Sequence, residues 1–413
     1  MGTMRLNVLK LGWFYHPVVG GVETCMKLLA EELLRQGHTP TVLCSGQGHD
    51  VINGVHVIRS PLINPKKSDI KQFETWFGEF LDKNSFDIVH CHNLSLRFNV
   101  EKSLAILKAC RHRGIPILEH AHNAQLRFAR DTKPIISFDF DKILCVSYFV
   151  AGKLSTIRDK KDLVVSHNPI DFSFLSHNNV NQDKVMRTLE ELKTNCVILF
   201  PARPVRIVNG KPVLHPQKKL KHLLDAAKVM KKKGLDFKIV IPGMIGQPGI
   251  DKKTALKANK LVQQTIKKLG IVDKVKFLGK TIPLEEMPTM YTACDVVCMP
   301  AVNETFGLGY AEGQAMAKAV VATNTGGALE VVKNGRTGFL VEPNNVKDLA
   351  AKLEILITDP SLRSEMGEAG RVRVKKLFAK EEVVKKLIST YRKVYMANII
   401  PITLRRINHW VHN

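Results

Sequence analysis

The chain has 413 residues, of which 45% are apolar and 24% are charged. This balance is typical of a globular protein and excludes extensive disorder, fibres and small disulfide scaffolds. No run approaches the roughly 20 consecutive apolar residues of a membrane-spanning helix, and no secretory cleavage pattern follows the N-terminus. The eight cysteines form no Cys-x-x-Cys pair, which favours reduced, buried thiols and a cytoplasmic protein.

The net charge of +24 is unusually high. Residues 211–280 alone contain 18 lysines and 4 aspartates. Such an excess attracts polyanions, anionic membrane surfaces or phosphorylated ligands, but it is also typical of solvated helix faces. The lysines expected on helices of this segment are Lys231, Lys232, Lys233, Lys252, Lys253, Lys257, Lys260, Lys267 and Lys268. We therefore expect either peripheral contact with an anionic membrane or a purely solvated surface.

In the first half of the chain, short apolar runs alternate with helical patterns. Strands are expected at 6–11, 41–44, 87–91 and 116–120. One helix is expected to carry Met26, Leu29, Leu33 and Leu34 on one face and to end at Gly37, and another is expected at 100–112. Strands that alternate with helices of about 10–15 residues predict βαβ units and a parallel sheet.

The alternation restarts in the second half, after an Asn-rich stretch. Strands are expected at 197–200, 237–241, 275–278 and 296–300, and helices at 220–230, 346–358 and 380–396. Residues 203–217 look like an extended loop. We predict two doubly wound α/β domains, at 1–180 and 190–385, joined near 175–195. A C-terminal tail at 386–413 is expected to return to the first domain, or else to form an interfacial amphipathic element.

The segment from Cys294 to Gly327 is the richest in functional residue types. A buried strand runs into Gly307 and Gly309, where the backbone can approach a ligand and a helix N-terminus faces an anion. Glu304 and Glu312 flank this turn. A carboxylate accepts hydrogen bonds from two hydroxyls, so each suits a sugar or ribose diol. The pattern favours a nucleotide-sugar over a bare nucleotide.

An ordered set of motifs resembles the retaining GT-B glycosyltransferases of family 4, over nearly the whole chain. The motifs are Asp295–Pro300, the Glu304-x7-Glu312 pair enclosing Phe306-Gly307-Leu308, Val320–Thr323 with Gly326-Gly327, Glu330, and Gly335-x-x-Gly338. Gly20-Gly21 is similar to the family's first glycine turn, Asp87–His90 to its recurrent strand end, and Asn168 with Asp171 to its Pro-Asn-Gly-Val-Asp motif, with Pro169 in place of Gly. The resemblance implies two Rossmann-like domains facing across a cleft, an acceptor-binding one first and a nucleotide-sugar-binding one second.

The resemblance also implies roles for single residues of the second domain. Glu312 would bind the ribose hydroxyls of the donor, and Glu304 the transferred sugar near its 3- and 4-hydroxyls. Arg203 matches the arginine that binds the donor diphosphate. The matching lysine is Lys218 by its distance from the following helix, while Lys219 stands where the family has glycine. Phe306, Gly307 and Leu308 would complete the donor site.

In the first domain, Gly20 and Gly21 would lie against the donor phosphates. His122 aligns with the family's histidine near the reactive face of the sugar, and His120 competes with it for this role. Two His-x-His pairs, 90/92 and 120/122, also suit zinc. Neither pair has a cysteine or carboxylate at ligand spacing, and the resemblance implies no obligatory metal. We therefore expect no metal site.

We predict a retaining, metal-independent hexosyltransferase that uses a nucleotide-diphosphate sugar, UDP-sugar rather than GDP-sugar, and no cofactor. The acceptor would be a hydroxyl of a sugar, a small molecule or a lipid-linked molecule. A sugar-phosphate synthase or phosphorylase on the same fold is the nearest alternative. A nucleic-acid-binding protein is the alternative from another class, with charge as its only support; we expect no nucleic-acid partner.

Overall fold

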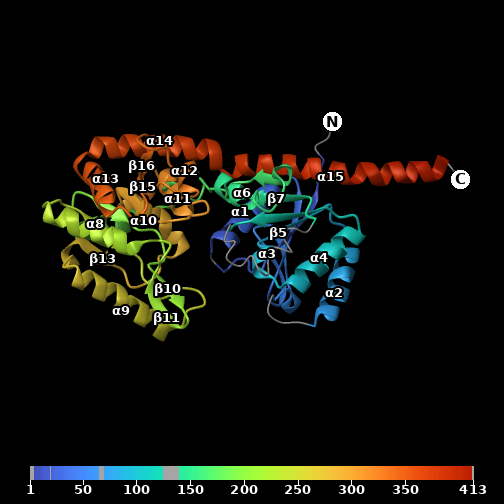
Figure 1. Ribbon diagram of the computed structural model, residues 1–413, viewed down its shortest axis with the longest axis horizontal. Coiled ribbons are helices and arrows are strands. Elements are labelled where there is room, and N and C mark those ends of the chain that lie inside the picture. The colour runs from blue at the N-terminus through green and yellow to red at the C-terminus, as the bar shows by residue number, and fades with distance from the viewer. Residues whose placement is uncertain (1–3, 19, 65–68, 124–138, 412–413) are drawn as a thin grey trace. The chain divides into compact units, whose positions relative to one another are not determined.

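The computed structural model describes residues 4–18, 20–64, 69–123 and 139–411, with the backbone alone for 95–96 and 400–411. The chain forms two compact units (Figure 1). Unit 1 comprises Met1–Pro169 and Lys380–Asn413, and unit 2 comprises Ile170–Ala379. The division falls between Pro169 and Ile170, whereas the sequence analysis placed the junction near 175–195. That stretch instead carries η4 (His177–Asn179) and α7 (Gln182–Leu192) of unit 2.

Unit 1 contains a sheet in the order β3-β4-β2-β1-β5-β6-β7-β8. The strands are β1 (Asn7–Leu11), β2 (Thr39–Cys44), β3 (Gly48–Ile52), β4 (Val55–Arg59), β5 (Ile88–His92), β6 (Ile117–Ala121), β7 (Lys142–Cys145) and β8 (Leu163–Val165). Every neighbouring pair is parallel except β3 and β4. The strand order reverses between β1 and β5, which is the place where doubly wound sheets bind ligands.

The helices of unit 1 follow from amphipathic patterns and local caps. Among the described residues they are α1 (Gly21–Arg35), η1 (Pro61–Ile63), α2 (Ile70–Lys83), α3 (Leu94–Arg97), α4 (Val100–His112), α6 (Tyr148–Leu154), η3 (Lys160–Asp162) and α15 (Lys380–Val411). The side chain of Asn99 accepts a hydrogen bond from the Lys102 amide and so caps α4. The predicted helix at 100–112 is confirmed, and the one predicted at 380–396 continues to Val411.

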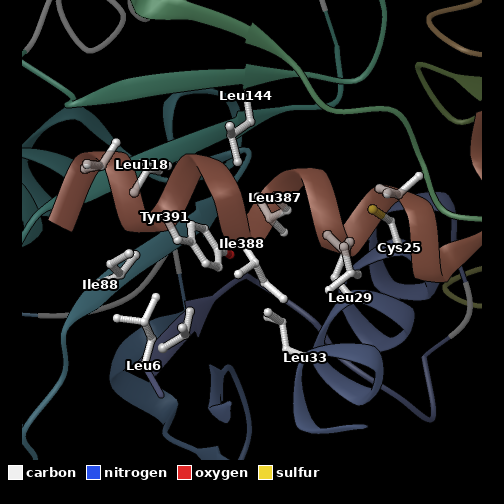
Figure 2. Packing of buried hydrophobic residues seen from close by; sticks show 14 residues of the cluster. Leu6, Cys25, Leu29, Leu33, Ile88, Leu118, Leu144, Leu387, Ile388 and Tyr391 are labelled. Carbon is white, nitrogen blue, oxygen red and sulfur yellow. The ribbon is translucent and has the colours of Figure 1, made fainter. Parts of the chain in front are cut away.

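The first half of α15 packs into the core of unit 1 (Figure 2). Leu387, Ile388 and Tyr391 are almost fully buried. They belong to one apolar cluster with Leu6, which precedes β1, and with Leu29, Leu33, Ile88, Leu118 and Leu144, which come from α1, β5, β6 and β7. Fully burying a large apolar side chain contributes about 1.5–3 kcal/mol, so these contacts hold α15 on unit 1.

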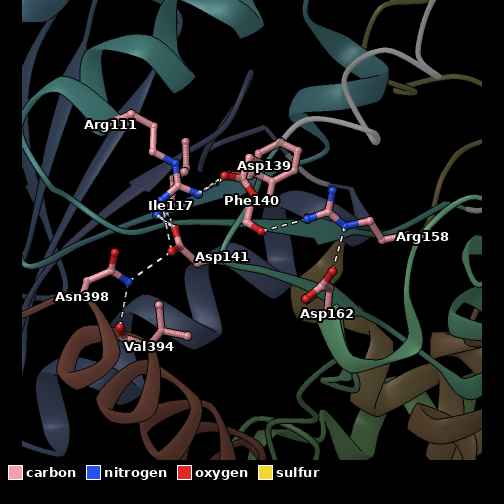
Figure 3. A network of polar contacts seen from close by, with 9 residues as sticks. All are labelled: Arg111, Ile117, Asp139, Phe140, Asp141, Arg158, Asp162, Val394 and Asn398. Atoms are coloured by element: carbon pink, nitrogen blue, oxygen red, sulfur yellow. Dashed lines mark hydrogen bonds and ion pairs between the residues drawn. The ribbon is translucent and has the colours of Figure 1, made fainter. Parts of the chain in front are cut away.

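A polar network also ties α15 to the sheet of unit 1 (Figure 3). The carboxylate of Asp141, just before β7, accepts hydrogen bonds from the side chain of Arg111 at 3.1 Å and from the Ile117 amide at 2.8 Å. It also accepts one from the side-chain amide of Asn398 at 3.1 Å. Asp141 therefore links α4, β6 and α15.

Unit 2 contains a parallel sheet in the order β13-β12-β9-β14-β15-β16. The strands are β9 (Val197–Leu199), β12 (Lys238–Ile241), β13 (Val275–Phe277), β14 (Val296–Met299), β15 (Ala319–Thr323) and β16 (Gly338–Val341). In sequence order this arrangement is 3-2-1-4-5-6, and its reversal lies between β9 and β14. The predicted fold class, two doubly wound parallel sheets, is confirmed.

The remaining elements of unit 2 are mostly helices. They are α8 (Leu220–Lys232), α9 (Lys252–Lys268), η5 (Val272–Lys274), η6 (Leu284–Glu286), α10 (Met287–Ala293), α11 (Leu308–Ala315), α12 (Ala328–Val331), α13 (Val346–Thr358) and α14 (Pro360–Phe378). The helix predicted at 346–358 is confirmed by α13.

The prediction of an extended loop at 203–217 was wrong. Residues 205–214 form an antiparallel hairpin of β10 (Val205–Val208) and β11 (Lys211–Leu214). Its turn is Asn209-Gly210, with φ of 48° and 73°. Asn-Gly is the preferred pair for a two-residue hairpin turn because both positions need positive φ. The hairpin stands between β9 and α8 and accounts for the extra length of this connection.

Candidate functional site

Two predicted site residues of unit 2 follow adjacent strands at the point where the strand order reverses. Arg203 comes after β9, and Glu304 comes after β14. The carboxyl ends of parallel strands meet at one edge of a sheet, so the two connections run side by side. They approach closely: a Cβ built on Gly309 would lie 3.0 Å from Cγ of Pro201.

The loop that carries Glu304 is held by a glycine turn after β15. The Gly327 amide donates a hydrogen bond to the Glu304 carbonyl at 2.7 Å. A Cβ on Gly326 would lie 2.3 Å from that same carbonyl oxygen, and one on Gly327 would lie 2.6 Å from the Thr305 carbonyl oxygen. Only glycine fits at these two positions, because any side chain would push the Glu304 loop away.

Lys218 and Glu304 form an ion pair. Nζ of Lys218 lies 2.5 Å from Oε2 of Glu304, and the two side chains are 22% and 15% exposed. Next to this pair, the Gln217 side chain donates to the Asn303 carbonyl at 2.9 Å, and the Val302 amide donates to the Gln217 carbonyl at 2.9 Å. Because the pair is shielded, its attraction is screened less than that of a surface ion pair.

The backbone separates the two candidate lysines. Lys219 is the N-cap of α8 and has a φ of 54°, in the left-handed region that favours glycine. This conformation explains why the resemblance places glycine at this position. Lys218, one residue earlier, directs its ammonium group to Glu304. The geometry therefore supports Lys218 as the lysine of the site.

His215 lies among the cations of this region, and the sequence analysis missed it. Its Nδ1 accepts a hydrogen bond from the Lys218 amide at 3.3 Å. Burial first, and then the positive charges of Lys218, Arg203 and Arg206, lower the pKa of His215 to about 4. The residue is therefore neutral at pH 7. The shared effect on His215 places Arg203 and Lys218 in one positively charged region, which suits a diphosphate.

Glu312 lies on α11, whose N-cap Gly307 has a φ of 99°. The Tyr291 hydroxyl donates a hydrogen bond to Oε2 of Glu312 at 2.8 Å. Burial raises the pKa of Glu312 to about 7, and the Tyr291 hydrogen bond opposes that rise. Phe306, which precedes Gly307, is buried with its ring edge-on to Phe378. Its side chain thus anchors the loop.

In unit 1, the histidine predictions fall at the end of β6. His122 is 8% exposed and His120 is fully buried, so only His122 has contact with solvent. The Nε2 atom of His122 lies 3.0 Å from Nδ1 of His92. Its amide donates to the side-chain oxygen of Asn93 at 3.0 Å. Burial and the nearby Lys10 lower the pKa of His122 to about 3. The accessibility favours His122 over His120 for contact with a ligand.

The predicted glycine turn of unit 1 lies at the start of α1. Gly20 is the N-cap, and Gly21 is the first helical residue. A Cβ on Gly20 would lie 2.3 Å from a carboxylate oxygen of Glu23. The predicted site residues are thus divided between the units, with Gly20, Gly21 and His122 in unit 1 and the others in unit 2.

Two family models match the chain. "Glycosyltransferase Family 4" matches residues 19–174, and "Glycosyl transferases group 1" matches residues 207–373. The first lies almost wholly in unit 1 and the second lies within unit 2. The chain belongs to glycosyltransferase family 4 and has the GT-B fold.

Individual relatives agree with this assignment. An uncharacterized glycosyltransferase of Methanocaldococcus jannaschii is 25% identical over 94% of this chain and 98% of its own. A D-inositol 3-phosphate glycosyltransferase of Rhodococcus erythropolis is 34% identical over 41% of this chain and 37% of its own. Among solved structures, Anabaena HepE in complex with UDP-glucose has a TM-score of 0.73 at 18% identity, covering 94% of this chain and all of that one.

Three further features of this family 4 protein concern its cysteines, the apolar character of its helices and its surface lysines. All eight cysteines are buried and free. None of the described helices combines the length and apolar character needed to cross a bilayer. The six lysines at 252, 253, 257, 260, 267 and 268 lie exposed along α9, whereas Lys231 pairs with Asp273 at 2.5 Å and Lys233 pairs with Glu354. Contact of α9 with an anionic membrane stays a prediction, which cosedimentation with anionic and neutral vesicles would test.

Proposed function

We propose that this protein transfers a hexosyl group from a nucleotide-diphosphate sugar to a hydroxyl acceptor, with retention of the anomeric configuration. The observation that carries the proposal is the Lys218–Glu304 pair at the reversal point of the unit 2 sheet. A cation for a phosphate and a carboxylate for sugar hydroxyls stand side by side there. This combination suits the junction between a diphosphate and a hexose.

Each side chain has a role that matches its chemistry. Glu312 accepts hydrogen bonds from the ribose hydroxyls, and Glu304 accepts them from the 3- and 4-hydroxyls of the transferred sugar. Arg203 and Lys218 bind the diphosphate. The positive charge that they share around His215 supports this role. Gly307 and the N-terminus of α11 add amides that face the same phosphates.

The reaction takes place on one face of the sugar. The bond from the anomeric carbon to the diphosphate oxygen breaks, and a bond to the acceptor oxygen forms on the same side. The acceptor's proton passes to the departing diphosphate. Arg203 and Lys218 stabilise the negative charge that builds on this leaving group, without a divalent metal. Catalysis is mainly positioning and electrostatics, and the role expected of His122 near the reactive carbon stays a prediction.

The donor that we propose is a UDP-sugar. Support comes from the structural similarity to HepE, a protein whose structures contain UDP, UDP with glucose, and UDP-glucose. The experiment is a thermal-shift and hydrolysis screen of UDP-, GDP- and ADP-sugars. A ligand at 100 times its dissociation constant stabilises the folded state by about 2.7 kcal/mol, which such a screen detects readily. Stabilisation by no nucleotide-sugar would contradict the proposal.

Two controls separate this proposal from its alternatives. Product analysis with inorganic phosphate or a sugar phosphate as the acceptor identifies a phosphorylase or a synthase. A gel shift at physiological salt tests for nucleic-acid binding, which weakens steeply as salt rises.

A further inference from the structure

Four histidines gather at the carboxyl ends of β5 and β6. The parallel register pairs His90 with Leu118 and His92 with His120. The two His-x-His pairs therefore face each other, and the rings of His90, His92, His120 and His122 stack with centroid separations of 4.4 to 5.3 Å. The sequence analysis considered each pair alone and found no third ligand. The neighbouring strand supplies it.

We propose that His90, His92 and His120 bind a single divalent transition-metal ion of the zinc type. One ring nitrogen of each lies within 4.8 Å of the others. Nε2 of His90 is 3.2 Å from Nδ1 of His120. Two imidazole nitrogens on a tetrahedral zinc ion, with bonds of about 2.0–2.1 Å, are separated by about 3.3–3.4 Å. The observed separation is thus close to the one that a shared ion requires.

A second observation is independent of these distances. Nε2 of His92 is buried and has no hydrogen-bond partner among the described residues. A buried polar atom without a partner costs about 1–3 kcal/mol, so it needs an explanation such as a water or an ion. A metal ion between the three rings would give this nitrogen a partner.

The outer contacts of His120 and His90 bear on which of their ring nitrogens can bind an ion. Nε2 of His120 lies 3.3 Å from the Ser166 carbonyl oxygen, to which it donates, and this leaves Nδ1 of His120 free of a proton. Nδ1 of His90 contacts the hydroxyl of Tyr391 and lies 3.0 Å from Nζ of Lys10. If Nδ1 of His90 donates its proton to the Tyr391 hydroxyl, Nε2 of His90 also has a lone pair for the ion. Such outer partners are typical of metal-binding histidines.

The cluster is enclosed by the fold, and Nζ of the buried Lys10 lies 3.0 Å from Nδ1 of His90. The three histidines are at most 1% exposed, which leaves the ion no path to substrate. The proposed ion therefore has a structural role and links β5 to β6.

A competing set of ligands shares one residue with the proposed site. Cys25, His120 and His122 also have ligand atoms within 4.8 Å of one another. Only the set of His90, His92 and His120 would give a partner to the buried Nε2 of His92. The two sets make different predictions for substitution of Cys25 and His92.

The experiment uses the full-length chain without an affinity tag. The protein is incubated with Zn²⁺ or Co²⁺ and desalted, and bound metal is measured by mass spectrometry and by the visible spectrum of tetrahedral Co²⁺. We expect one ion per chain in the wild type. His92→Gln and His120→Gln should lose it. Cys25→Ser, and His56→Gln at an exposed histidine of the same unit, should keep it.

Three results would overturn the proposal. A wild-type protein that retains no Zn²⁺ or Co²⁺, and whose Tm neither ion raises, would leave only a network of hydrogen-bonded histidines. Loss of the ion from Cys25→Ser would indicate the competing set. Retention by His92→Gln would exclude His92 as a ligand. If circular dichroism shows that a variant does not fold, the metal content and the Co²⁺ spectrum of the wild type decide whether the proposal holds. None of these readouts depends on the proposed activity.

Discussion

Nζ of Lys218 lies 2.5 Å from Oε2 of Glu304, although 86 residues separate the two in sequence. The pair joins the residue before α8 to the loop after β14. Each side chain has a distinct partner on the donor in the proposed reaction, the diphosphate for Lys218 and the sugar for Glu304. The pair therefore holds both groups in position before the donor arrives, which lowers the cost of ordering them.

The first prediction separates Lys218 from Lys219. Lys218→Ala removes the proposed charged partner of the diphosphate and should lower kcat by roughly one to two decades, which corresponds to ~1.5–3 kcal/mol. Lys219→Gly should leave kcat unchanged. It should also raise the free energy of unfolding by ~1 kcal/mol, because it relieves a left-handed lysine with a φ of 54°. Steady-state kinetics and chemical denaturation measure both. A larger loss of kcat in Lys219→Gly than in Lys218→Ala would instead assign the diphosphate-binding role to Lys219.

A second prediction concerns the glycine turn beneath Glu304. Gly326→Ala and Gly335→Ala both place a side chain at positive φ, 65° and 72°. Each should cost ~1–2 kcal/mol of stability from backbone strain alone. Only the first forces a Cβ against the Glu304 carbonyl, whereas nothing lies within 4 Å of the second. Gly326→Ala should therefore also lower kcat at least tenfold, while Gly335→Ala keeps it. Equal kcat values in the two variants would contradict this account.

The third prediction follows from the raised pKa of Glu312. Its folded-state pKa is about 7 against an ordinary value of 4.5, so the folded state binds more protons between these pH values. Its contribution to stability is therefore lost as pH rises from about 4.5 to about 7. Glu312→Gln should be more stable than the wild type at pH 8, by up to ~2–3 kcal/mol, and nearly equal to it at pH 4.5. Thermal denaturation across this range measures the difference. A Glu312→Gln variant that is less stable than the wild type at pH 8 would show that ionisation of Glu312 does not destabilise the folded state.

The fourth prediction is that the donor diphosphate needs no added divalent cation. In the proposed site Arg203 and Lys218 supply the positive charge, so initial rates with Mg²⁺ or Mn²⁺ added and with both withheld should agree. The comparison varies only the Mg²⁺ or Mn²⁺ in the assay. It therefore removes no ion from the proposed histidine site. Strong activation by Mg²⁺ would show that the cations of unit 2 do not suffice.

Periodicity and turn chemistry predicted most of the fold. Strands such as β1 and β14 and helices such as α4 and α13 follow from local patterns, and these patterns are continuous in sequence. The hairpin at 205–214 was missed although Asn209-Gly210 marks it, because the segment 203–217 contains three prolines and each strand has only four residues. The local turn was the better guide there.

Residues of the candidate site could be predicted from the sequence only where they belong to a recognisable motif. Glu304 and Glu312 stand in a recognisable pattern, but the choice of Lys218 depends on a backbone angle at Lys219. His215 has no motif, and its place among three cations follows from the tertiary structure. The histidine array depends on the register between β5 and β6, which brings His92 beside His120. Contacts of this kind between distant segments cannot be read from spacing along the chain.

The most direct test of the proposed donor site is the pair of constants kcat and KM for the donor in Glu304→Ala and Glu312→Ala. In the proposed site Glu312 binds the ribose, which does not change during transfer, so Glu312→Ala should raise KM by roughly one to two decades with little change in kcat. Glu304 is proposed to bind the sugar that moves, so Glu304→Ala should lower kcat by a similar factor with little change in KM. Unchanged constants in both variants, or the two effects exchanged, would contradict the assignment of the site.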